Sequence, residues 1–159
     1  GTFVSERTRG GGAEEMMSAL GDQQLVLASS ARWAGPVTAG RTAWPLARVV
    51  DLEGDSLFEI GRREPSGNPF AAHIENFVLP AGTPDGGHVW LAFVNDPRVL
   101  LYSVRDDRLR TVTRTLPFEW ETIPDTFSPA DLRPAPGSPP APPFDVVTYG
   151  IASDGRGRG

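Results

Sequence analysis

Three short apolar runs separated by two polar turns constrain the fold of this chain more than any other feature. They form the stretch GGHVWLAFVNDPRVLLYSVRDDRLRTV at residues 86–112. Runs and turns cover residues 88–94, 95–97, 98–104, 105–107 and 108–114. Apolar runs of this length between Asn, Asp and Pro residues are typical of strands joined by tight turns. The last run alternates Arg with Leu, Val and Thr, which predicts an outer strand. The stretch therefore predicts an antiparallel three-stranded meander.

A second part of the chain repeats this pattern. Strand signals occur at residues 23–30, 46–52 and 56–60, and Gly54 supplies the positive φ that a tight hairpin between the last two needs. GDQQLVLASS superimposes on DGGHVWLAFV, and ARVVDLEGDSLFEI superimposes on RVLLYSVRDDRLRT. A third copy begins in VVTYGIASDGRGRG. The predicted repeat units cover approximately residues 20–64, 82–116 and 145–159.

Two segments leave alternatives open. AEEMMSAL, residues 13–20, reads equally as one or two helical turns or as an extended lead-in to the next strand. The Pro-rich loop at residues 132–144 excludes helix and central strand. It matches the spacing of a ligand for a proline-recognising domain, but a stiff connection between repeats is the favoured interpretation.

Repeated antiparallel units are typical of β-propellers. The phrases LARVVDLEGDSLFEIGRRE and DGGHVWLAFVNDPRVLLYSVRDDRLRTVTRTL, with the shorter YGIASDGRGRG, make the chain resemble bacterial six-bladed β-propeller repeat proteins with NHL-like and TolB-like relatives. The resemblance implies an all-β fold of four-stranded antiparallel meanders, and a periplasmic or extracellular location for the full-length protein. Six blades need roughly 250–300 residues. We therefore expect residues 1–159 to form a single partial propeller domain of about two to three blades.

The composition excludes several classes of protein. The net charge of −5 and the pI near 5.0 argue against a nucleic-acid surface, which needs a basic stripe. There is no cysteine, so neither a disulfide nor a thiolate metal site is possible. No apolar run reaches the length of about 18 residues that a membrane span needs. The first residues, GTFVSERTRGGG, lack the basic-then-apolar pattern of a signal peptide.

Candidates for metal or catalytic chemistry are weak. His73 and His88 are the two imidazoles, and their spacing to Glu75 and Asp85 matches no established ligand pattern, so surface or strand-edge positions are expected for both. Acidic residues in the turns could supply oxygen ligands for calcium, but Asp is favoured in turns for local backbone reasons. These are Asp51, Glu53, Asp55, Asp96, Asp106 and Asp107. The sequence thus predicts no catalytic residue, no metal site and no cofactor.

Tryptophan is the more suggestive residue type, with four copies in the chain. Trp33 and Trp44 lie in a long loop that also holds Arg41. Aromatic residues beside Arg are typical of recognition surfaces, so Trp33, Arg41 and Trp44 are the predicted residues for binding a ligand or partner. Packing over a neighbouring blade is the alternative role, and the commoner one.

The sequence favours a non-enzymatic binding or scaffold module that presents a rim-loop surface to a protein or small ligand. The alternative is a propeller hydrolase or lyase resembling the gluconolactonase class, which would hold one divalent cation in the central channel. Such an enzyme needs carboxylate, Asn or His side chains at inner-strand ends. The visible strands QLVLASS and HVWLAFV offer mainly apolar and small residues there, which favours binding.

Overall fold

Two antiparallel sheets make up the fold, and helix is almost absent. The computed structural model describes residues 15–29, 45–64, 66–68, 71–124, 126–132, 146, 148 and 150–153. The first sheet contains β1 (Glu15–Leu20), β2 (Gln24–Ser29), β3 (Ala47–Asp51) and β4 (Ser56–Ile60), and the second contains β5 (Val78–Gly82), β6 (His88–Phe93), β7 (Arg98–Ser103) and β8 (Arg108–Thr113). Each sheet is a meander in chain order. The all-β class and the four-stranded antiparallel units are therefore confirmed.

The turns between strands follow the predicted chemistry. Gly54 has a φ of 91°, and the Asp51 carboxylate accepts the backbone N–H of Asp55 at 2.8 Å across the same hairpin. In the β7–β8 turn, Asp107 adopts a left-handed φ of 48° and accepts a hydrogen bond from the Tyr102 hydroxyl at 2.8 Å. Burial, with this hydrogen bond, raises the pKa of Tyr102 to about 12.

The first strand of each sheet lies ahead of the predicted repeat units. Residues 15–20 form β1, so the helical alternative for residues 13–20 is wrong and the extended one holds for the described part. β5 was not expected, because its short run contains Pro80, which has no N–H to donate. The sheets therefore begin at Glu15 and Val78.

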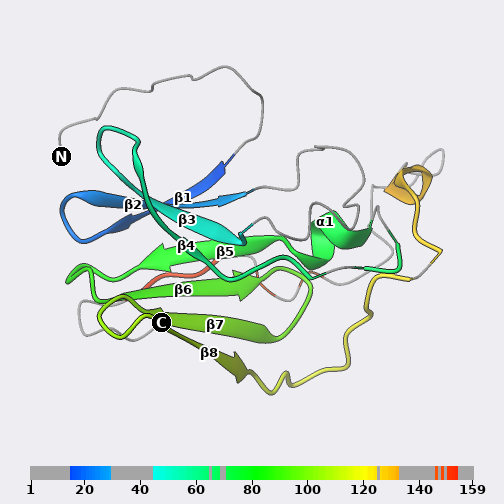
Figure 1. The fold of residues 1–159 in the computed structure, drawn as a ribbon. Coiled ribbons are helices and arrows are strands. Elements are labelled where there is room, and N and C mark those ends of the chain that lie inside the picture. The colour runs from blue at the N-terminus through cyan, green and yellow to red at the C-terminus, as the bar shows by residue number, and fades with distance from the viewer. Residues whose placement is uncertain are drawn as a thin grey trace.

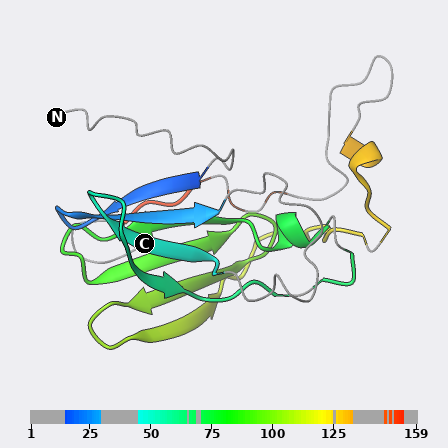
Figure 2. The ribbon, with the colours of Figure 1, turned by 45° about the horizontal axis from the view of Figure 1, so that its top comes forward.

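The two sheets pack face to face through a shared apolar core. Val26, Val49 and Ile60 of the first sheet belong to the same buried cluster as Val89, Leu91 and Phe93 of the second. Figures 1 and 2 show the first sheet stacked on the second, with β5 next to β1 and β2. Each of these side chains contributes roughly 1.5–3 kcal/mol through burial. The core-facing residues of β2 and β6, which recur every second position, therefore make the contact between the sheets.

The other face of the second sheet is less completely covered. Trp90 lies on this face, opposite to Phe93, and is half-buried, whereas Phe93 is only 2% exposed. β8 is exposed along its whole length, which confirms it as the outer strand.

The first strands of the two sheets, β1 and β5, meet at Gly82. The Gly21 N–H donates to the Thr83 carbonyl at 3.0 Å, and the Gly82 N–H donates to Ser18 Oγ at 3.0 Å. A Cβ at residue 82 would lie 2.1 Å from the Ala19 carbonyl oxygen, so only glycine allows this approach. The ends of β1 and β5 therefore lie side by side.

A segment near the C-terminus joins the same junction. The Thr148 N–H donates to the Val94 carbonyl at 3.1 Å, and Ser153 Oγ donates to the Gly82 carbonyl at 2.6 Å. Because Val94 pairs with Phe77 beside the start of β5 and Gly82 lies at its end, residues 148 and 150–153 follow the direction of β5 (red in Figure 1). This is the segment in which the sequence predicts a third repeat unit.

A one-turn helix, α1 (Ala71–Glu75), lies between the sheets in the chain and was not predicted. Two asparagines bracket it: Asn68 Oδ1 accepts the Ala71 N–H at 3.2 Å, and the Asn76 N–H donates to the Ala72 carbonyl at 3.2 Å. A 3-10 helix covers Pro129–Leu132, and the rest of the predicted Pro-rich loop, residues 133–144, lies outside the described residues. Within the described ranges, no helix has the length and apolarity needed to span a membrane.

Candidate functional site

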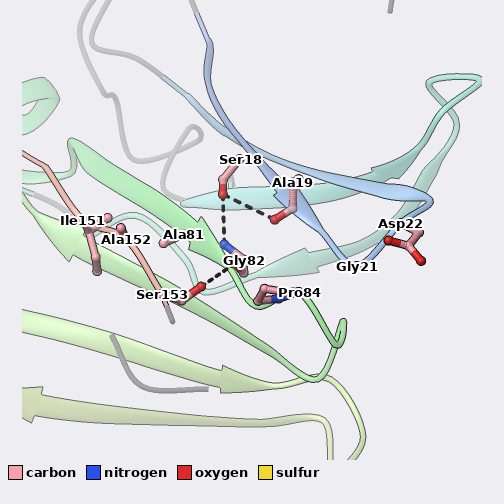
Figure 3. A pocket seen from close by; sticks show the side chains of 10 residues that line it. All are labelled: Ser18, Ala19, Gly21, Asp22, Ala81, Gly82, Pro84, Ile151, Ala152 and Ser153. Carbon is pink, nitrogen blue, oxygen red and sulfur yellow. Dashed lines mark hydrogen bonds between the residues drawn. The ribbon is translucent and has the colours of Figure 1, made fainter. Parts of the chain in front are cut away.

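One hollow lies where β1 and β5 end, and Figure 3 shows it from close by. Its volume is about 360 Å³, and it is lined by the ends of β1 and β5 and by residues 151–153. Ser18 Oγ accepts the Gly82 N–H and donates to the Ala19 carbonyl at 3.4 Å, while Ser153 Oγ donates to the Gly82 carbonyl. Both hydroxyl groups therefore hold the three segments together.

A larger cleft of about 620 Å³ lies at the other end of the sheets. The residues that define this connection-end cleft are Glu64, Glu75, Asn95, Asp96, Arg98 and Trp120. They come from the segment after β4, from α1, from the β6–β7 hairpin and from the chain after β8. Figure 1 shows α1, this hairpin and the yellow segment after β8 at the same end of the molecule. The cleft is thus formed mainly by the segments that connect or follow the strands.

Arg98 organises one wall of the connection-end cleft. Its Nε donates to Asp96 Oδ2 at 2.7 Å, and its Nη1 donates to Glu64 Oε1 at 2.8 Å. The guanidinium also lies over the Phe93 ring, 4.7 Å from the ring centre. The hydrogen bond to Glu64, with that to Asp96, raises the pKa of Arg98, although partial burial opposes this. Arg98 is therefore a fixed cation that neutralises one of its two carboxylate partners.

Other polar groups of the connection-end cleft have no hydrogen-bond or ion-pair partner among the described residues. Asn95 is only 5% exposed, yet its carboxamide has no hydrogen-bond partner among the described residues. Glu75 makes no ion pair within the same part of the chain, and the half-buried Trp120 borders the cleft. The carboxamide atoms are not among the fully buried unpartnered atoms, so they keep contact with solvent and can exchange water for a ligand in the cleft. The connection-end cleft is therefore the candidate site.

The residues predicted from sequence to bind a partner, Trp33, Arg41 and Trp44, lie outside the described residues. The strands on either side of them are described, and β2 ends and β3 begins at the end of the sheets that holds the connection-end cleft. Sequence reasoning missed the cleft itself. The signals it offered were the turn residues 95–97 and a tryptophan, Trp120, in a segment without strand character.

The metal candidates do not converge. His73 is buried in α1, which corrects its expected surface position, and the half-buried His88 opens β6. Asp51 accepts the Asp55 N–H, and Ser103 Oγ donates to Asp106 at 3.0 Å, so these carboxylates stabilise their own turns. Among the described residues there is no group of three or more His, Asp or Glu side chains that could hold a metal ion.

Comparisons were made with models of protein families, with curated proteins and with solved structures, and none of them gave a match.

Proposed function

We propose that this chain is a non-enzymatic binding module built from β-propeller blades, with the connection-end cleft as its recognition surface for a protein or small ligand. The observation that carries the proposal is Asn95, which borders the cleft, is only 5% exposed as a residue, and has a carboxamide with no hydrogen-bond partner among the described residues. At the opposite end of the sheets, the Ser18 and Ser153 hydroxyl groups are already used to join strands.

Two features support the propeller part of the proposal. Both sheets are four-stranded meanders whose first strands, β1 and β5, lie side by side. Residues 148 and 150–153 then follow β5 in the same direction, as the first strand of a third blade would. A periplasmic or extracellular location of the full-length protein belongs to the same proposal, since it rests on the resemblance to propeller repeat proteins.

Thermal unfolding in the presence of a ligand panel tests the binding proposal. The panel contains short peptides, sugars and small organic ions, and each compound is measured with the wild-type chain and with Trp120→Ala. A compound present at a free concentration of 100 times its Kd stabilises the native state by about 2.7 kcal/mol. We expect at least one compound to raise the wild-type midpoint and not that of Trp120→Ala. Hydrolysis of lactones that depends on an added divalent cation would instead support the gluconolactonase-like alternative.

A further inference from the structure

We infer that the connection-end cleft recognises a cationic side chain, a lysine or arginine carried by a peptide segment of a partner protein. This inference rests on the proposed function, and adds the chemical class of the ligand to it.

The first argument is the charge of the cleft. Its lining contains three carboxylates, Glu64, Glu75 and Asp96, and one guanidinium, Arg98, which leaves a net charge of −2. Arg98 already pairs with Glu64 and Asp96 at 2.8 and 2.7 Å. Glu75 has no such partner among the residues described, so its charge is available to a ligand. An anionic ligand would meet two uncompensated negative charges, whereas a cation reduces them.

The second argument is the aromatic wall. Trp120 is half-buried and borders the same cleft. The face of an indole ring attracts a cation more strongly than the other aromatic side chains do. Arg98 lies 4.7 Å from the centre of the Phe93 ring and is paired with carboxylates, so the chain itself contains an example of this arrangement. Glu75 and Trp120 offer an incoming cation the same two kinds of group.

The third argument is Asn95, which points to a peptide as the carrier of the cation. Its carboxamide offers both a donor and an acceptor, which are the groups that match the C=O and N–H of a peptide backbone. The residue is 5% exposed, its carboxamide reaches solvent at the cleft, and this group has no hydrogen-bond partner in the described part of the chain. A small inorganic cation would use the oxygen only, whereas a peptide group can use both the oxygen and the N–H.

The experiment is calorimetric titration of the intact chain with the blocked peptide Gly-Gly-Ser-Lys-Ser-Gly-Gly. Two further peptides replace the lysine with arginine or with Nε-acetyllysine. We expect the lysine and arginine peptides to bind, and the acetylated peptide to bind at least about tenfold more weakly because it has lost its charge. Raising the salt concentration should weaken the binding of the charged peptides, because partly exposed charges are screened.

Three variants locate the interaction. Glu75→Gln should weaken binding of the lysine peptide by about 3- to 10-fold, and Trp120→Ala by about 2- to 30-fold. Trp120→Phe keeps an aromatic face and should retain part of the affinity. The matched control is Glu53→Gln, an exposed glutamate in the β3–β4 hairpin at the opposite end of the sheet, which should leave affinity unchanged.

The outcomes separate this inference from the proposed function. If the charged and acetylated peptides bind equally and Trp120→Ala weakens both, the preference for a cationic side chain is overturned. The cleft would then still be the recognition surface of the proposed function. Loss of affinity in Glu53→Gln as large as in Glu75→Gln would overturn it as well. If no peptide binds and no compound of the panel stabilises the chain through the cleft, the proposed function itself fails.

Discussion

Gly82→Ala should destabilise the chain strongly, because Gly82 is the point of closest approach between the two sheets. The added Cβ would lie 2.1 Å from the Ala19 carbonyl oxygen and 2.9 Å from the Leu20 Cα, and all of these neighbours are backbone atoms. Ordinary contact begins at 3.4 Å, so β1 and β5 must separate by more than 1 Å. Such a shift breaks the hydrogen bond from the Gly82 N–H to Ser18 Oγ, which is now 3.0 Å long.

The magnitude follows from these two effects. Overpacking costs about 1–3 kcal/mol, and loss of a hydrogen bond adds about 1 kcal/mol. We expect the free energy of unfolding to fall by about 2–4 kcal/mol, which lowers the thermal midpoint by about 5–15 °C in a chain of this size.

The assay is urea unfolding followed by tryptophan fluorescence. Gly150→Ala is the matched control, because its Cβ meets no atom within 4 Å and its φ is not positive. If Gly82→Ala is as stable as this control to within about 0.5 kcal/mol, the sheets do not meet at Gly82 and the reasoning is refuted.

Three further predictions concern pH, the core and metal ions. The pKa of Tyr102 is raised to about 12, so the contribution of its neutral phenol to stability is complete below pH 10 and is lost as the pH rises through 12. Over this pH range, urea unfolding should show the free energy of unfolding fall by an amount on the order of 2–3 kcal/mol that Tyr102→Phe does not share. Equal losses in both proteins would refute this assignment. Phe93→Ala should cost about 3–5 kcal/mol, and Trp90→Ala clearly less, because Trp90 is half-buried; the reverse order in urea unfolding would contradict the packing. Calcium, zinc or magnesium should leave the thermal midpoint unchanged, whereas a saturable rise abolished by Asp96→Asn would favour the metal-dependent alternative.

Local turn chemistry made much of the fold predictable. Gly54 has the positive φ that the hairpin requires, and the polar alternation of residues 108–113 marks an outer strand. These features depend on neighbours in the chain, so a single sequence contains them.

The missed elements depend on distant contacts. Residues 15–20 contain Glu, Met and Ala, which favour helix, yet they form β1 because they pair with β2. The residues of β5 include Pro80, which weakens the strand signal. Pairing with β2 decides the first segment, most of which is exposed, and burial decides the second, so local propensity decides neither.

The connection-end cleft could not be predicted from spacing. Glu64, Glu75, Asn95 and Trp120 come from four separate segments, and only the packing of α1 and of the chain after β8 around the β6–β7 hairpin brings them together. Asn95 reads in the sequence as an ordinary turn residue. Its place at the cleft, with a carboxamide that makes no hydrogen bond to other described residues, exists only in the folded chain.

Amide and side-chain ¹H–¹⁵N NMR spectra recorded during titration with the lysine peptide test the central claim most directly. The account predicts that the Asn95 carboxamide and the Trp120 indole N–H shift and saturate with one dissociation constant, while the Gly21 and Gly82 amides at the opposite end stay in place. Shifts confined to Gly21 and Gly82, or no shift of Asn95 and Trp120 at saturating peptide, would contradict it.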